Sequence, residues 1–407
     1  MRHRIATLIL AATAVTPSSA LWAGEGLTLD VAGDVGLELR AFVDSPAPST
    51  VGFERQPETW QGSIHMAPEV VIDHANGRDR FVVEPFARLD SDDSERTHVD
   101  LREATWQRVG DDWDLVVGLD VVFWGVTESR HLVNVINQID AVEDLDEEDF
   151  LGQPMIAFGL QRSWGYLRAF VLPGFRERTF PGIEGRLRAS PPVDVDAARF
   201  TRSRGNDALD AALRYSHVIG DWDLGAHLFV GTSREPRFEQ SSDGEHLVPV
   251  YERMEQIGLD VQNTTGAWLT KLEAIVRSTD SDDFAAAVAG VEYTLFGLVG
   301  AADLGLLAEF LRDGRDPARA PATAFDRDLF AGARLTLNDV ADTNVLLGGF
   351  VDLDSGSTSL RFEGDRRIGD AWRAEVTAQV FLDVDARDAL AAFENDAFAQ
   401  LSLTWSF

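Results

Sequence analysis

The sequence predicts an all-β fold: a transmembrane, antiparallel, up-and-down β-barrel of about 18 strands, with 16 possible. Three observations support this prediction. The N-terminus has the layout of an export signal, the rest of the chain alternates apolar and polar residues with a period of two, and the chain ends on Phe407. In such a barrel, short periplasmic turns and long extracellular loops join the strands.

The first residues have the composition of a signal peptide. Arg2 and Arg4 form a basic region, residues 5–15 are apolar, and small residues follow. Because cleavage after Ala20 or after Ala23 fits this pattern, residues 1–23 are predicted to be the signal peptide. Residues 24–407 are then predicted to form a single outer-membrane β-barrel domain. The apolar run is too short to span a membrane as a helix, and no longer one follows it.

The first and last predicted strands show the alternation most clearly. In residues 27–43 leucine, valine and alanine share one face, while Asp30, Asp34 and Glu38 share the other. In residues 397–407 apolar side chains again alternate with polar ones, up to Phe407. The first of these segments is long for a globular strand but suits a tilted strand that crosses a bilayer and projects beyond it.

Similar segments between these two bring the total to eighteen. They are predicted at residues 60–73, 79–90, 98–109, 112–124, 154–162, 164–172, 207–218, 221–232, 250–262, 265–277, 284–295, 302–312, 329–338, 342–353, 357–367 and 371–382.

The links between these segments differ in length according to their order. Links after even-numbered segments are short, such as Gly110-Asp111 and Ile219-Gly220, whereas those after odd-numbered segments are mostly longer, as in 125–153 and 173–206. A soluble β-sandwich gives no reason for this sorting. A bacterial outer-membrane barrel does, because its turns lie at one rim and its loops at the other. Both termini are therefore expected at the turn rim.

Aromatic residues are expected to mark the same rim. Four tryptophans open strands just after short turns, each in phase with the apolar face, and two further aromatic residues end the last strand. Large aromatic side chains at one level are typical of an interfacial girdle. The predicted girdle comprises Trp113, Trp222, Trp268, Trp372, Trp405 and Phe407.

Composition restricts the possible partners. The chain has 68 acidic residues against 36 lysines and arginines, a formal net charge of −32, and no cysteine. Such a charge repels phosphates, so no nucleic-acid partner is expected. The expected partners are outer-membrane lipid and lipopolysaccharide, the barrel-assembly machinery through the C-terminal strand, and a small-molecule solute. No cofactor is expected.

The polar faces of the predicted strands carry charges of both signs. Opposed charges across a pore create a transverse field that selects polar solutes. Alternatively, the same residues form salt bridges that brace a plugged interior, and the sequence leaves both interpretations open. The candidate pore-lining residues are Glu38, Arg40, Arg80, Glu84, Arg88, Arg214, Lys271, Glu273, Arg277, Arg361, Glu363 and Arg373.

Three acidic runs fall on the long-loop side, at residues 90–95, 143–149 and 280–283. Their carboxylates are hard oxygen ligands that suit Ca²⁺ or Mg²⁺, although none has EF-hand spacing. A solvated acidic surface is the alternative interpretation, and no metal ligand is assigned from the sequence.

Two long loops are candidates for a constriction or a lid. Loop 125–153 carries an apolar stripe at roughly helical spacing, from Leu132 to Val142, which predicts that it folds into or across the barrel mouth. Loop 173–206 is the one basic tract of the chain, with seven arginines and four prolines. It either pairs with acidic loops, as a lid or by mutual neutralisation, or attracts an anionic solute.

Short motifs carry a resemblance to a family. Residues 100–104 (Asp-Leu-Arg-Glu-Ala), Phe123-Trp124-Gly125, residues 134–140 (Asn-Val-Ile-Asn-Gln-Ile-Asp) and residues 172–175 (Leu-Pro-Gly-Phe) resemble the porin-type outer-membrane barrels of the DUF1302 and alginate-export kind. The resemblance covers roughly residues 99–182. It implies passage of a solute across the outer membrane of a Gram-negative bacterium, without naming the solute.

The sequence thus predicts a porin or channel for small solutes. The alternatives are a gated transporter of a hydrophobic solute and a plugged structural barrel. An outer-membrane hydrolase is less favoured, because no Gly-x-Ser-x-Gly element occurs and the pair Ser216-His217 lies at the turn-side end of its strand. The chain is therefore predicted not to be an enzyme.

Overall fold

The computed structural model describes residues 26–48, 51–74 and 76–407. The predicted signal peptide lies outside the described residues. No helix in these ranges is long and apolar enough to cross a membrane. The helical turns are four short 3₁₀ segments: η1 (Phe53–Arg55), η2 (Val195–Ala197), η3 (Gly205–Asp207) and η4 (Ala389–Phe393).

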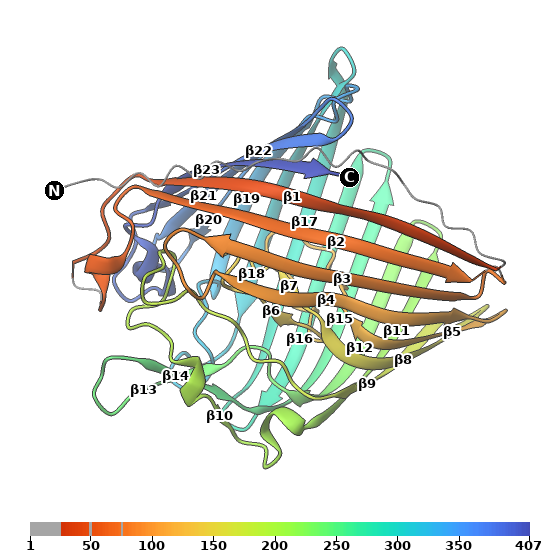
Figure 1. The fold of residues 1–407 in the computed structure, drawn as a ribbon, viewed down its shortest axis with the longest axis horizontal. Helices are drawn as coiled ribbons and strands as arrows, with labels where there is room; N and C mark the ends of the chain where they lie inside the picture. Colours follow the sequence, from red (N-terminus) through yellow and green to blue (C-terminus); the bar gives the residue numbers. More distant parts are fainter. Residues whose placement is uncertain (1–25, 49–50, 75) are drawn as a thin grey trace.

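A single 18-stranded antiparallel sheet makes the wall of the molecule, and β23 pairs with β1 to close it (Figure 1). The wall consists, in order, of β1 (Leu27–Phe42), β2 (Trp60–His74), β3 (Asp79–Asp90), β4 (His98–Val109), β5 (Trp113–Asp120), β8 (Gln153–Arg162), β9 (Gly165–Pro173), β11 (Leu209–Ile219), β12 (Trp222–Thr232), β15 (Arg253–Thr265), β16 (Trp268–Thr279), β17 (Asp283–Val299), β18 (Ala302–Asp313), β19 (Arg327–Thr336), β20 (Asn344–Asp352), β21 (Thr358–Ile368), β22 (Trp372–Leu382) and β23 (Phe398–Ser406). The prediction of a closed barrel of about eighteen strands is confirmed.

Five shorter strands lie in the connections. β6 (Gln138–Ile139) pairs with β7 (Phe150–Leu151) inside the barrel. In the loops at one end, β14 (Leu247–Tyr251) pairs with β10 (Arg199–Phe200) and with β13 (Arg237–Gln240) (Figure 1). Both β1 and β23 have their terminal ends at the rim where the short turns lie, because Leu27 is the Cα partner of His74, the last residue before the first turn.

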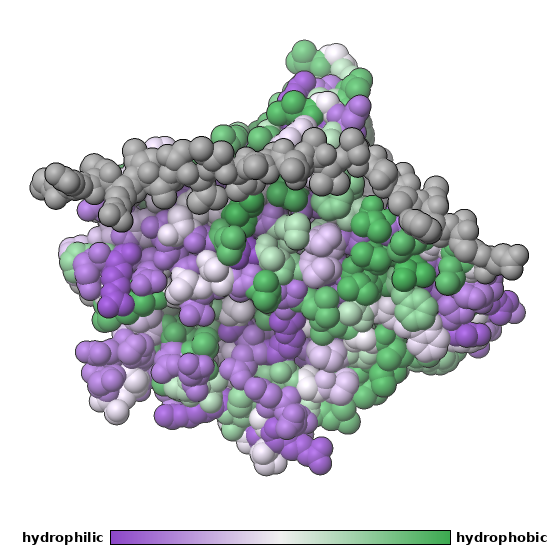
Figure 2. Space-filling view, in the orientation of Figure 1, coloured by the Kyte–Doolittle hydropathy of each residue, from purple (hydrophilic) through white to green (hydrophobic). Residues whose placement is uncertain are grey.

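The alternation of each strand sorts its side chains between two environments. On β1, Leu37 and Leu39 are 52% and 48% exposed, whereas the neighbouring Arg40 is 6% exposed because it points inward. Figure 2 shows apolar residues along the visible strands and polar residues gathered at the loop end. A closed sheet with an apolar exterior satisfies its backbone internally and needs lipid around it. The even strand number and the sorting of turns from loops are those of an outer-membrane barrel, as predicted.

One part of the wall is shorter than expected. The segment predicted at 112–124 ends as β5 at Asp120, because the chain then leaves the wall and enters the barrel. The side chains of two asparagines replace the strand pairing: Asn137 Oδ1 accepts a hydrogen bond from Val122 N at 2.9 Å, and Asn134 Oδ1 accepts one from Trp124 N at 2.7 Å. These two asparagines belong to the motif that carried the family resemblance.

Residues 121–152, called the lumen segment below, contain no helix, so the helical interpretation of the apolar stripe is wrong. The stripe is nevertheless buried, with Val133, Val135 and Ile136 each at most 1% exposed. An extended chain that is packed on both sides buries residues without helical spacing, and this is why the periodicity was misleading.

Candidate functional site

The interior of the barrel, called the lumen below, is crossed by the lumen segment. Its first anchor is Glu273 on β16, whose side chain is 0% exposed. The Glu273 carboxylate accepts hydrogen bonds from Val126 N at 2.7 Å, Thr127 N at 3.1 Å, Thr127 Oγ1 at 2.8 Å and Val133 N at 3.1 Å. Hydrogen bonds to an ionised acceptor contribute about 1.5–3 kcal/mol each. This one carboxylate therefore fixes the course of the segment near β16.

The second anchor follows at once along the chain. Glu309 on β18 accepts hydrogen bonds from Glu128 N and Ser129 N, both at 2.9 Å. The Glu128 side chain in turn pairs with Arg334 on β19 and lies 3.8 Å from Lys271 Nζ on β16. Both anchors are acidic wall residues that satisfy backbone amides of the segment. The segment thus needs no secondary structure of its own here.

The other end of the segment is anchored by arginines. Glu143 Oε2 lies 2.6 Å from Nη2 of Arg88 on β3. The Asp144 and Asp146 carboxylates lie 3.1 and 2.9 Å from Nη2 of Arg361 on β21. The segment therefore reaches from β16 and β18 to β3, on the opposite side of the 18-stranded wall, and it also contacts β21, three strands from β18. The lumen segment therefore crosses the interior of the barrel from one wall to the other.

A third group of contacts comes from the loop between β12 and β15. Glu235 in this loop accepts hydrogen bonds from Arg277 Nη1 at 3.0 Å and Arg315 Nη1 at 2.9 Å, and it lies 3.7 Å from Arg130 of the lumen segment. Burial alone raises the pKa of a carboxyl group, but the arginines, with Arg178 among them, hold the pKa of Glu235 well below its usual range. Glu235 is ionised and links a loop, the wall and the segment.

One side of the lumen wall is apolar. The inward-facing rings of Phe170, Phe229, Phe284 and Phe330 are buried beneath the lumen segment, together with its apolar stripe. The inward face is therefore not polar along every strand. The physical reason is that the segment excludes water from this half of the lumen, so that inward apolar side chains form a core there.

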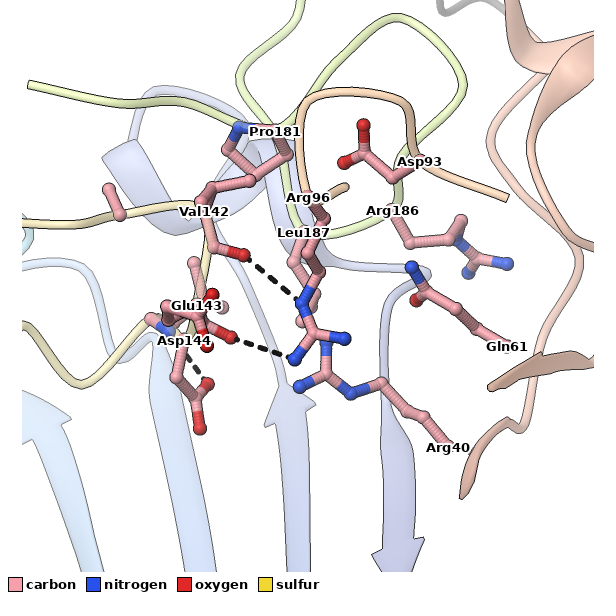
Figure 3. Close-up of a pocket in the computed structure, with 12 residues that line it drawn as sticks. Arg40, Gln61, Asp93, Arg96, Val142, Glu143, Asp144, Pro181, Arg186 and Leu187 are labelled. Carbon is pink, nitrogen blue, oxygen red and sulfur yellow. Dashed lines mark hydrogen bonds between the residues drawn. The ribbon is translucent and has the colours of Figure 1, made fainter. Parts of the chain in front are cut away.

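Near β1 the segment leaves a small cavity of about 10 Å³, room for a single water molecule. Figure 3 shows Arg96 beside it, reaching toward the carbonyl oxygens of Val142 and Glu143. Arg40 also lines this cavity. Its Nε donates to Gln400 Oε1 at 2.9 Å, and its guanidinium lies over the ring of Phe398. Arg96, in the loop between β3 and β4, thus holds the lumen segment in place here.

Five carboxylates lie on the lumen side of strands β1 to β5. They occupy inward positions on five consecutive strands and are called the acid row below. Glu84 and Glu103 are direct Cα partners. Glu69 and Asp120 each lie one residue beyond a printed pair, Val70 with Val83 and Leu119 with Ala104, and Asp34 is the partner of Ala67, two residues before Glu69. The acid row comprises Asp34 on β1, Glu69 on β2, Glu84 on β3, Glu103 on β4 and Asp120 on β5.

None of the five carboxylates of the acid row forms an ion pair with a lysine or arginine in the described part of the chain. Arginines on the same or nearby strands pair with other acids: Arg80 with Asp73 at 2.8 Å, and Arg168 with Asp114 at 3.7 Å. All five side chains are half-buried, so they reach solvent from inside the barrel.

The residues predicted to line a pore fall into two groups. Arg40, Arg88, Arg214, Glu273 and Arg277 are buried, and most of them hold the lumen segment or a neighbouring strand. Glu273 in particular faces the segment instead of open water. Glu38 pairs with Arg88 and Lys271 lies near Glu128, and their side chains are also nearly buried, at 8% and 10% exposure. The remaining ones keep more solvent contact, and most are paired: Arg80 with Asp73, Arg361 with Glu363 and Arg373 with Asp365, while Glu84 belongs to the acid row.

The predicted girdle residues lie at the turn ends of their strands. Trp372 and Trp405 are Cα partners on adjacent strands, and the rings of Trp405 and Phe407 are 5.2 Å apart. Trp268 packs on Tyr293 at 4.6 Å, and Trp222 follows the turn after β11, as Trp113 follows the turn after β4. Their anchoring in the lipid headgroup layer stays a prediction.

The long loops are joined by ion pairs. In the basic tract, Arg176 pairs with Asp100, Arg178 with Glu147 and Arg186 with Asp396. This favours mutual neutralisation of the loops over an anion-attracting surface. In the acidic runs, Asp90 pairs with Arg96 and Asp282 with Arg319. Binding of Ca²⁺ or Mg²⁺ in these runs stays a prediction.

Sequence reasoning missed the acid row and the role of Glu235. Four of the five acid-row positions were not singled out, because each is an isolated acid on its own strand. Only the strand register brings them to one level. The predicted strands 79–90 and 98–109 could have been aligned through the loop that joins them. That alignment would have brought Glu84 close to Glu103.

Solved structures share this fold. The structures of OccK8 (OprE), OccD3 (OpdP) and OccK3 (OpdO) of Pseudomonas aeruginosa have TM-scores of 0.54, 0.51 and 0.51 to this chain, at 9%, 10% and 11% sequence identity. They cover 93%, 94% and 93% of this chain, and 98%, 91% and 96% of their own. Neither a protein-family model nor a curated protein matches the chain. The resemblance to the DUF1302 and alginate-export families therefore stays a prediction.

Proposed function

We propose that the chain is an outer-membrane channel for small solutes, and that it prefers cationic ones. The observation that carries this proposal is the acid row. Carboxylates inside a protein are costly unless they are paired or hydrated. Because the acid row has no ion-pair partner among the described residues, its charges are hydrated, and an aqueous route must reach them.

The charges around the acid row favour cationic over anionic solutes. Cationic side chains elsewhere in the lumen form ion pairs with carboxylates: Lys271 and Arg334 with Glu128, and Arg373 with Asp365. The acid row adds up to five negative charges without a counter-charge. In a narrow conduit with low-dielectric walls, an unbalanced ring of carboxylates attracts cations and repels anions.

The lumen segment narrows the conduit in this proposal. Its polar edge carries Glu128, Asp144 and Asp146, while its apolar edge is packed against β8, β9, β12 and β17. The remaining passage lies between the segment and strands β1–β5. The solute therefore meets the acid row after passing the segment.

Liposome swelling tests the proposal. Proteoliposomes are placed in iso-osmotic solutions of a cationic solute (arginine), a neutral one (glucose) and an anionic one (succinate). The proposal predicts swelling, fastest for arginine and slowest for succinate. Equal rates for all three contradict the cation preference, and no swelling with any solute contradicts the channel.

A plugged structural barrel is the second candidate. The observation that favours it is the number of anchors on the lumen segment, from Glu273 and Glu309 at its beginning to Arg88 and Arg361 near its end. In that case the segment closes the lumen completely. Planar-bilayer recording separates the two, because a plugged barrel inserts without conductance steps.

A further inference from the structure

Three acceptor atoms meet where the lumen segment contacts β4. His98 Nε2 on β4 lies 3.7 Å from Asp140 Oδ2 and 3.6 Å from Glu143 Oε1, and all three atoms are within 4.8 Å of one another. Asp140 is 0% exposed and Glu143 is 6% exposed. His98 Nε2 receives no hydrogen bond from the residues that the structure describes, whereas Asp140 Oδ2 has the Arg102 guanidinium beside it, with Nη2 at 2.7 Å.

The orientation of the His98 ring is set by its other nitrogen. Nδ1 lies 3.2 Å from the carbonyl oxygen of Arg96, and a carbonyl only accepts, so Nδ1 carries the proton and donates it. Phe86 packs on the ring at 5.5 Å. Nε2 of the neutral ring is then an acceptor whose lone pair points at two carboxylate oxygens. A backbone carbonyl that fixes a histidine in this way is the usual outer support of a metal-bound imidazole.

Three acceptors that face one another repel unless a positive centre lies between them. A proton on Nε2 does not fit this geometry, because both distances exceed the roughly 2.7–3.2 Å of an N–H···O hydrogen bond. A metal ion does. Ligand bonds of about 2.0–2.2 Å, as to nitrogen and carboxylate oxygen of a zinc site, separate neighbouring ligand atoms by about 3.3–3.6 Å.

The surrounding donors hold the two carboxylates from outside. Arg102 Nη2 lies 2.7 Å from Asp140 Oδ2, and Thr179 Oγ1 donates to Asp140 Oδ1. Arg88 contacts both oxygens of Glu143, at 3.1 and 2.6 Å. Each carboxylate oxygen keeps a second lone pair, which remains free toward His98 Nε2. The arginines therefore position the ligands and offset part of their charge, as an outer shell does in metal sites.

We propose that His98, Asp140 and Glu143 bind a divalent transition-metal ion, for which Zn²⁺ is the probe, with water completing the coordination. An imidazole nitrogen with two carboxylates suits such an ion better than Ca²⁺ or Mg²⁺, which take oxygen ligands. The bound ion links wall strand β4 to the lumen segment. It is thus a further anchor of the segment, and it is independent of which solute passes the channel.

The test uses untagged, folded protein in detergent, treated with EDTA and dialysed. Titration calorimetry with Zn²⁺ is expected to show one equivalent bound. His98→Gln and Asp140→Asn are each expected to weaken binding at least about tenfold, in the range found when metal-site residues are removed. The matched control His246→Gln, in the loop between β13 and β14, is expected to bind as the unchanged protein does. No binding, or equal binding by all four proteins, overturns the proposal.

Two further measurements keep the result interpretable. Heat-modifiable gel mobility shows whether each variant forms the barrel, and a variant that fails this check is replaced by His98→Ala or Glu143→Gln. Co²⁺ replaces Zn²⁺ and gives visible absorption that reports nitrogen and oxygen ligation. The proposal predicts a Co²⁺ spectrum that is lost in His98→Gln. A spectrum that persists in this variant overturns the assignment of His98.

Discussion

Gly33 and Phe407 exchange two backbone hydrogen bonds across the seam of the barrel. Gly33 N donates to Phe407 O at 3.2 Å, and Phe407 N donates to Gly33 O at 3.0 Å. The Phe407 ring also lies against Gly33, where an added Cβ would come within 3.0 Å of it. The last residue of the chain therefore extends the pairing of β23 with β1 that closes the wall, and it covers a glycine on the lipid face.

Deletion of Phe407 is expected to impair assembly more than conductance. The deletion removes both hydrogen bonds to Gly33 and the ring packed on Trp405, all at the closing seam. The amount of folded protein in the outer membrane is measured by heat-modifiable mobility, with Phe407→Trp as the control that keeps a ring. Normal accumulation of the truncated protein contradicts this prediction and, with it, the proposed role of the C-terminal strand in recognition by the assembly machinery.

Glu273→Ala is expected to release the lumen segment near β16. Three backbone amides and one hydroxyl lose their acceptor, at a cost of about 1–3 kcal/mol for each group left unpaired. We expect larger and noisier single-channel conductance, because the segment then samples open positions. Glu255→Ala on β15, an exposed outward-facing acid, is the matched control. Unchanged conductance in Glu273→Ala shows that the segment does not narrow the conduit.

The attachment of the lumen segment near Arg361 is expected to weaken as the pH rises toward 8. Burial, together with the charge of Asp144, raises the pKa of Asp146 to about 8. A carboxyl group whose pKa is raised on folding stabilises the folded arrangement below its ordinary pKa, and that contribution is lost as pH rises through the raised value. Conductance fluctuations are therefore expected to increase as the pH rises from about 4 to about 8, the interval between the ordinary and the raised pKa. Asp146→Asn is expected to remove this dependence, and persistence of the dependence in that variant contradicts the assignment.

The strands of the wall were predictable from the sequence because the pattern that specifies each strand lies within the strand and its adjacent turns. The two-residue period and the turn residues placed all eighteen strands, for example β11 at 209–219 against a prediction of 207–218. The contents of the lumen were not predictable in the same way. Glu273 anchors amides about 140 positions earlier in the chain, and no local pattern encodes such a contact.

The inward apolar residues likewise depend on contacts with a distant part of the chain, which the local sequence pattern does not encode. Phe229 and Phe284 follow the polar phase of their strands, and only the presence of the lumen segment explains why they are apolar. Likewise, the apolar stripe of residues 132–142 predicted burial correctly but a helix wrongly. Burial depends on composition, whereas backbone conformation here depends on wall carboxylates and on Asn134 and Asn137.

Removal of charge from the acid row is expected to lower the cation preference without closing the channel. The double variant Glu84→Gln, Glu103→Gln removes two adjacent carboxylates and conserves their size. We expect the cation-to-anion permeability ratio to fall about threefold, because the local field that attracts cations weakens. The control double variant Glu54→Gln, Glu58→Gln makes the same charge change in an exposed loop. An equal effect of both double variants contradicts a specific role of the acid row.

The most direct test of the account is the reversal potential of single channels in planar bilayers under a gradient of KCl. The account predicts conductance steps and a reversal potential displaced toward the equilibrium potential of K⁺, with a displacement that grows at lower salt because screening weakens. A reversal potential at zero or toward that of Cl⁻ contradicts the cation preference. Well-inserted protein without conductance contradicts the channel itself.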